Sequence, residues 1–284
     1  MRIVVPESFR HAADLSAQDA SRDPRLPLPD AELEIDMRAC GFIRPPAALW
    51  CAVYALLAKA QGASCRLLVP ENFGVCVYLK SLGLFDVLKT AGVEIDDRGV
   101  PERKDTQIVL PLSRFNTEYE VDKLSNQVLD VLSSSPLGSP HLNAFVSDVF
   151  AELANNAVQH SESSVGALGA IQFYQGEYGR RFMCVVADGG IGIRRSLEKN
   201  PALRSKVPYD WVAIDLALRE RVSGTGLPTR GIGLSWINDE MRKGSRYLII
   251  HSGQGMLSIY ENAESEARRV MLFPGTLASA SMPG

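Results

Sequence analysis

Three short segments of the chain hold residues whose types and spacing could do chemistry. The first places Glu152, Asn156 and His160 four residues apart, so a helix would align them along one face. A neutral amide oxygen suits Mg²⁺, which also takes phosphate oxygens and water as ligands. A carboxylate one turn earlier could deprotonate a water or a hydroxyl group, and the imidazole could contact a phosphate. Taken alone, the segment is more simply a helix with a polar edge.

The second segment is the sequence Asp188-Gly189-Gly190-Ile191-Gly192, which directly follows an apolar run. A carboxylate at the end of a strand can accept a hydrogen bond from an exocyclic amino group, as on adenine. Gly190 and Gly192 lack side chains, so their backbone could approach a base and a sugar closely. By itself the segment is also an ordinary Asp-Gly-Gly turn.

The third segment is Arg230-Gly231-Ile232-Gly233-Leu234, which precedes a predicted helix over residues 234–241. Glycine amides at the start of a helix can bind a phosphate through unpaired N–H groups and the helix dipole. Arg230 could add a positive charge. The alternative is a glycine-rich helix cap. Only the three segments together therefore indicate a nucleotide site.

The elements that must position these segments lie in the second half of the chain. Apolar periodicity predicts helices over residues 118–132 and 142–160 and a strand over 107–112. A hairpin is expected from 170–174 and 182–187, and a second from 247–251 and 256–260 across Ser252-Gly253-Gln254-Gly255. A last strand is expected at 270–273. We expect an antiparallel or mixed sheet with helices on one face, followed by a flexible tail over residues 275–284.

The first half alternates between strands and helices. Strands are predicted at residues 3–5, 33–37 and 65–69, and helices at 47–60, after Pro45 and Pro46, and at 72–82, closed by Gly83. Residues 21–30 are expected to form a loop and 96–105 a linker. The fold class is therefore α/β (α+β), with a small α/β domain at residues 1–100 and a second domain at 106–274.

The order and context of the three segments resemble the GHKL, or Bergerat-fold, ATP-binding domain. Histidine kinases, type II topoisomerases, heat-shock chaperones and anti-sigma serine kinases share this α/β sandwich. The resemblance covers about residues 106–274 and implies ATP and Mg²⁺ as cofactors. It implies that Asn156 binds Mg²⁺, that Asp188 binds the adenine amino group and that Glu152 is a candidate general base. It further implies phosphate contact by His160, an ATP lid over residues 194–229, and a pocket lined by Gly190, Gly192, Arg230, Gly231, Gly233 and Leu234.

The first half resembles a STAS domain, the fold of anti-sigma-factor antagonists. The similarity lies in residues 33–37, the helix after Pro46, residues 65–70 and residues 78–85. Regulatory members of that family carry a phosphorylatable serine at the start of the first long helix. Here residues 43–47 have no hydroxyl group, so phosphorylation cannot switch the domain at that point. The simpler interpretation is a docking domain.

Composition excludes several classes of protein. The net charge of −3 gives no basic footprint for nucleic acid or an anionic membrane, and the apolar runs are too short to span a bilayer. The N-terminus lacks the apolar core of a signal peptide. Five scattered cysteines fit a reducing compartment. We therefore expect a cytoplasmic protein.

No histidine-bearing dimerisation helix precedes the second domain, which argues against a sensor histidine kinase. The strand and helix before residue 142 resemble those of anti-sigma serine kinases. The leading hypothesis is an ATP-binding regulatory protein of the partner-switching type, a Ser/Thr protein kinase or an ATP-dependent protein–protein switch. The alternatives are an ATPase clamp, in which Glu152 activates water and ATP closes a homodimer, and an ATP sensor without turnover. The expected partner is a regulatory protein.

Overall fold

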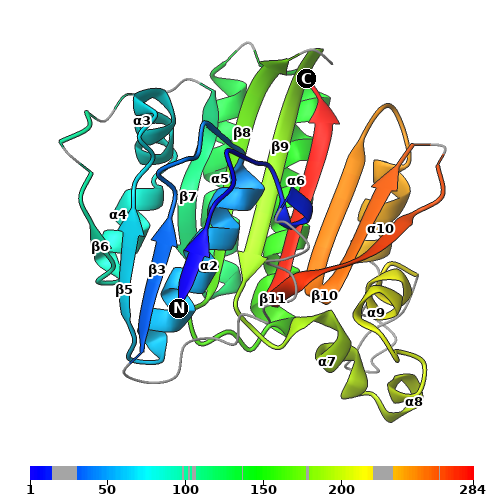
Figure 1. Ribbon diagram of the computed structural model, residues 1–284. Helices are drawn as coiled ribbons and strands as arrows, with labels where there is room; N and C mark the ends of the chain where they lie inside the picture. Colours follow the sequence, from blue (N-terminus) through cyan, green and yellow to red (C-terminus); the bar gives the residue numbers. More distant parts are fainter. Residues whose placement is uncertain are drawn as a thin grey trace.

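Two main β-sheets lie on opposite sides of one buried helix (Figure 1). The computed structural model describes residues 1–14, 31–97, 99–101, 103, 107–135, 137–176, 179–219, 233–261 and 263–284. Both helices and strands contribute to the architecture, which is mixed α/β as expected. The predicted loop at 21–30 lies outside the described residues, as does part of the predicted linker.

The first sheet is entirely parallel, with strand order β1-β3-β5-β6. Its strands are β1 (Arg2–Val4), β3 (Glu32–Asp36), β5 (Ser64–Leu68) and β6 (Glu94–Ile95). The helices α2 (Pro45–Ala60), α3 (Phe73–Ser81) and α4 (Leu84–Thr90) follow β4 and β5 along the chain. A short parallel pair, β2 (Ser8–Phe9) with β4 (Phe42–Ile43), and the 3₁₀ turn Ala12–Asp14 complete what we call the N-terminal unit.

The second sheet is antiparallel, with strand order β10-β11-β9-β8-β7. Its strands are β7 (Ile108–Phe115), β8 (Ala167–Gly176), β9 (Gly179–Asp188), β10 (Tyr247–Tyr260) and β11 (Glu266–Pro283). The helices α5 (Glu118–Ser133), α6 (Pro140–His160) and α10 (Gly233–Met241) cover one face. The remaining helices, α7 (Gly192–Glu198), α8 (Pro201–Arg204) and α9 (Asp210–Ala217), lie between β9 and α10 in the chain.

Helix α2 begins and ends where the sequence indicates. Pro45 and Pro46 occupy its first two positions, where the missing N–H groups cost nothing, and Gly62 follows its end with φ of 84°. Every residue from Pro45 to Ala58 is buried. A helix that is apolar on all sides can be stable only if other elements cover all of them.

The two sheets provide that cover from opposite sides, so the two halves of the chain share one core. Helix α2 contacts β3 and β5 on one side and β8, β9 and β11 on the other. Side chains of both sheets, among them Ile35 and Val185, belong to a single cluster of buried residues. The Tyr54 hydroxyl group donates a hydrogen bond to the carbonyl oxygen of Leu272, which joins α2 to β11. The contact between the halves is therefore an interior rather than a docking surface.

Replacing Tyr54 by alanine should destabilise both halves together. Its ring is fully buried between Trp50 and Phe273, with centroids 4.2 and 6.1 Å away. Loss of a buried aromatic ring costs about 3–5 kcal/mol. We expect one cooperative transition at lower temperature, measured by thermal unfolding. Tyr119→Ala is the matched control because Tyr119 is 78% exposed, and two separate transitions would contradict the shared core.

The second predicted hairpin is wrong, because residues 247–260 form one strand. β10 pairs with β11 along its length, with register shifts between Ser252 and Gly255. Gly253 has φ of 58°, and Asp210 of α9 packs against Gly253 and Gly255, where added Cβ atoms would lie 2.5 Å from neighbouring atoms. The glycines therefore make a bulge that admits α9, and they do not turn the chain.

The predicted flexible tail is also wrong. Residues 275–283 belong to β11, which extends from Glu266 to Pro283 and lies between β9 and β10. Ala278, Ala280 and Met282 are buried in the same cluster as α6. Small residues suggested a mobile end, but pairing on both edges of the strand and packing on its faces override that weak local preference.

Candidate functional site

The carboxyl group of Asp188 lies at the end of β9, and its surroundings leave it almost no contact with water. The residue is 4% exposed. Its Oδ1 atom accepts hydrogen bonds from the backbone N–H groups of Gly190, at 2.8 Å, and Thr276, at 3.3 Å. Among the described residues, no group donates to Oδ2. One oxygen is therefore held by the protein, and the other can accept from a ligand.

Burial raises the pKa of Asp188 to about 7, and the two backbone hydrogen bonds offset only part of that effect. A buried carboxyl group with a raised pKa at a strand end is a feature common at functional sites. An external donor would favour its charged form.

The glycines after Asp188 bring the backbone into close contact with its neighbours. A Cβ atom at Gly190 would lie 1.9 Å from the carbonyl oxygen of Ser161, which accepts from the N–H of Ile191 at 2.7 Å. Gly192 starts α7 with φ of 74°. Ser161 is the C-cap of α6, so this loop is fastened to the end of that helix. The Leu57 side chain of α2 packs against Gly189 from the other side.

Two residues of the site lie in the segment predicted to be a tail. A Cβ atom at Gly275 would lie 2.1 Å from the carbonyl oxygen of Asp188, and the φ of Gly275 is 105°. The N–H of Thr276 donates to Asp188, and its hydroxyl group lies 3.1 Å from Ser252 Oγ. Ser252 Oγ in turn accepts from the N–H of Ile193 at 2.9 Å. No local sequence signal marked either residue, because they reach Asp188 only through the pairing of β11 with β9.

Helix α6 carries Glu152, Asn156 and His160, as predicted. The Asn156 Nδ2 atom donates to Glu152 Oε1 at 2.8 Å and to the Glu152 carbonyl oxygen at 2.7 Å. A Cβ atom at Gly233 would lie 1.6 Å from Glu152 Oε1, so the first turn of α10 rests on this carboxylate. All three side chains are half-buried, and His160 lies in the last turn, next to Ser161.

The structure brings Glu152, Asn156 and Gly233 together. Through Ser161 and Gly190 it also connects α6, whose polar side chains Glu152, Asn156 and His160 we call the α6 stripe, to Asp188. Leu234 is half-buried and packs against the core beside α6. Arg230 and Gly231 lie outside the described residues, so their predicted roles stay predictions.

The predicted lid is described for residues 194–219, which form α7, α8 and α9. Within this segment, residues Asp210–Ala217 form an ordered helix, α9. Several of its cations already have carboxylate partners: Arg194 with Glu198 at 3.1 Å, Arg219 with Asp215 at 2.7 Å, and Lys199 with Glu162. Asp210 Oδ2 accepts from the N–H of Gln254 at 2.8 Å, which fastens α9 to β10.

A divalent cation fits one atom of the described site. With its Nδ2 atom committed to Glu152, Asn156 keeps its Oδ1 atom without a hydrogen bond among the described residues, and amide oxygen is a suitable Mg²⁺ ligand. No group of three or more His, Cys, Asp or Glu side chains in the described part of the chain could hold a metal by itself. Phosphate oxygens and water would have to supply the other ligands.

No protein-family model matches this chain, and no curated protein is significantly similar to it. Within the described ranges, no helix is both long and apolar enough to cross a membrane. The geometry of the site around Asp188 and α6 therefore carries the functional assignment.

Proposed function

We propose that this chain is an ATP- and Mg²⁺-binding regulatory protein of the GHKL type. The observation that supports this most is the buried Asp188 carboxyl group, with one oxygen engaged by Gly190 and Thr276 and the other available. Such an acceptor is complementary to the exocyclic amino group of adenine.

The α6 stripe supports the assignment of the phosphate end. Asn156 Oδ1 would hold the cation that neutralises phosphate charge. The first turn of α10 would offer backbone N–H groups and the positive end of its dipole. In the structure this end of α10 rests on the Glu152 carboxylate, an anion in the position where phosphate oxygens are expected.

Glu152 is the candidate general base, because its carboxylate lies at the same helix end as the proposed phosphates. If it deprotonates the hydroxyl group of a protein substrate, the chain is a Ser/Thr kinase. If it deprotonates water, the chain is an ATPase. The leading proposal is a regulatory kinase or an ATP-dependent switch. It is favoured because α2 covers the face of the second sheet that α5, α6 and α10 leave open, and because Leu57 of α2 contacts the loop after Asp188. A partner protein would then dock on another surface of the molecule.

Incubation with γ-labelled ATP would separate the proposals. Transfer of label to a co-purified protein supports the kinase, and release of phosphate from the chain alone supports the ATPase. Tight retention of ATP without either outcome supports the sensor. Glu152→Gln should keep ATP binding within a few-fold and reduce either reaction by about 10²–10⁴-fold. If the chain retains no ATP under any condition, the proposed function is wrong.

The affinity for adenosine and ATP should rise with pH through about 7. The amino group needs the ionised carboxyl group, whereas burial keeps Asp188 largely protonated below its pKa of about 7. At pH 6 about one site in ten is ionised, so binding should be about tenfold weaker than at pH 8. Titration calorimetry would measure this. Adenosine is the control because it has no phosphate that titrates in this range, and a flat profile would contradict the assigned contact.

A further inference from the structure

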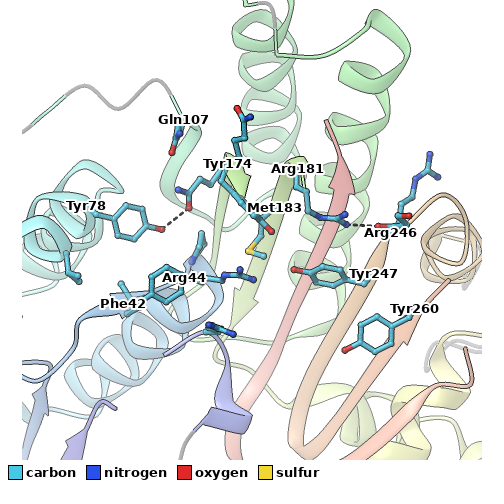
Figure 2. Close-up of a pocket in the computed structure, with 18 of the residues that line it drawn as sticks. Phe42, Arg44, Tyr78, Gln107, Tyr174, Arg181, Met183, Arg246, Tyr247 and Tyr260 are labelled. Carbon is cyan, nitrogen blue, oxygen red and sulfur yellow. Dashed lines mark hydrogen bonds between the residues drawn. The ribbon is translucent and has the colours of Figure 1, made fainter. Parts of the chain in front are cut away.

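A groove of about 1090 Å³ lies between the N-terminal unit and the second sheet (Figure 2). Its lining residues on β9 are Gly179, Arg181 and Met183, at the beginning of that strand, whereas Asp188 is its last residue. Arg181 and Asp188 are seven positions apart on this strand, a distance of roughly 23 Å. The groove is therefore a separate cavity, at the upper limit of ordinary small-molecule sites.

The groove is strongly cationic. Four arginines line it, and the one acidic lining residue, Glu261, already accepts hydrogen bonds from the N–H groups of Gly244 and Ser245. Among the described residues, the guanidinium groups of Arg10, Arg44 and Arg181 form no ion pair with a carboxylate, and the nearby Asp14 carboxylate accepts from the backbone N–H of Arg10 at 2.6 Å. Arg246 pairs with Glu240, outside the lining. The four arginines are Arg10, Arg44, Arg181 and Arg246.

Within the described part of the chain, Arg181 is a buried cation whose side-chain hydrogen bonds go to neutral acceptors. It is 8% exposed, and it donates from Nε to Ser281 Oγ at 2.9 Å and from Nη2 to the Ser245 carbonyl oxygen at 2.7 Å. Burying a charge without a counter-ion is costly. An anion in the groove would compensate that cost. The positive end of α2, whose N-cap is Arg44, would attract the same anion.

Aromatic rings accompany the charges. Phe42 is 44% exposed and Tyr260 37% exposed, and both line the groove. The guanidinium groups of Arg10 and Arg44 lie 5.7 and 5.9 Å from the centre of the Phe42 ring, and that of Arg44 lies 5.5 Å from the Tyr174 ring. Exposed rings interleaved with arginines are the arrangement that binds phosphates and stacks bases. Three amide side chains, Gln107, Gln172 and Gln175, line the same cavity.

We propose that this groove binds a free nucleotide. Its phosphate would lie against Arg10 and Arg44, and its base would stack on the exposed aromatic rings, Phe42 and Tyr260. Inorganic phosphate alone would leave the exposed rings unused, and a neutral ring compound would leave the arginines uncompensated. The net charge of −3 disfavours a long nucleic acid, whose affinity depends on extended basic surface. The site is independent of the ATP site proposed at Asp188.

Equilibrium dialysis of the full chain against the ribonucleoside 5′-mono- and diphosphates would test this. It is done in the Asp188→Asn background, which weakens binding of adenine at residue 188, and the Arg44→Ala variant separates groove binding from any binding that remains there. We expect at least one nucleotide to bind, its nucleoside and inorganic phosphate to bind more weakly, and Arg44→Ala to weaken binding by about tenfold or more. Arg44 caps α2 through its backbone only, so alanine should preserve the helix. Arg66→Ala is the control, because Arg66 pairs with Glu34 outside the groove lining.

Three results would overturn the proposal. One is that no nucleotide binds, and another is that Arg44→Ala and Tyr260→Ala bind as well as Arg66→Ala does. The third is that a short single-stranded RNA or a phosphotyrosine peptide binds where no free nucleotide does. If Arg44→Ala lowers the unfolding temperature, Tyr260→Ala decides the question, because Tyr260 lies at the exposed rim.

Discussion

Asp188→Asn should lower the affinity for ATP by at least about a hundredfold while leaving the chain folded. The asparagine Oδ1 atom can still accept from Gly190 and Thr276. Its NH₂ group would then face the adenine amino group, so two donors would meet in a buried site, which costs roughly 3 kcal/mol. The fold should tolerate the change, because burial already raises the pKa of Asp188 and so favours a neutral side chain there.

A change of base provides the control for this variant. Inosine triphosphate carries a carbonyl group where adenine carries its amino group, and this carbonyl could accept from the new asparagine. The ratio of ATP affinity to inosine triphosphate affinity should therefore fall strongly in Asp188→Asn. Titration calorimetry with both nucleotides measures it. If ATP affinity is unchanged in the variant, the pocket is assigned to the wrong residues.

Ala280→Asp should prevent folding or cost more than about 4 kcal/mol of unfolding free energy. Ala280 is fully buried in the last third of β11, where it pairs with Cys184 of β9 on one side and Leu248 of β10 on the other. A carboxylate there would be buried without a partner, which is among the most destabilising of substitutions. Circular dichroism during thermal unfolding would record the loss.

Ala263→Asp is the matched control for that substitution. Ala263 is exposed in the turn between β10 and β11, so the same change should alter stability by no more than about 0.5 kcal/mol. A chain that lacks residues 275–284 should fail in the same way as Ala280→Asp, because β9 and β10 would lose the strand between them. A stable truncated chain would contradict the assigned topology.

Local patterns predicted most of the elements, because each of these has a period or a boundary residue that acts over a few positions. The proline pair and Gly62 bound α2, and Thr117 begins α5 with a capping box that includes Glu120. The first hairpin, β8 with β9, is confirmed. Sequence-based prediction failed at the β10 bulge and at the end of β11, because contacts with residues far away in the chain determine the conformation of the glycines and small residues there.

Part of the candidate site was equally accessible to sequence reasoning. Glu152 and Asn156 form a stripe on α6, and Asp188 ends a buried strand, as spacing and apolar patterning indicate. Thr276 and Gly275 could not be assigned in this way, because they reach Asp188 only through the pairing of β11 with β9. The groove was hidden for a similar reason, since its lining comes from segments between Arg10 and Glu261.

By itself, the sequence determined which residues are candidates for a nucleotide site and which helices and strands carry them, because side-chain chemistry and backbone periodicity are local properties. Only the tertiary structure decided that α2 lies between the two sheets, that the last residues form a central strand, and that arginines and rings from both halves line one groove. Those outcomes depend on burying apolar surface between segments far apart in the chain. That free energy is gained only when the segments pack together, so neither segment's sequence alone determines it.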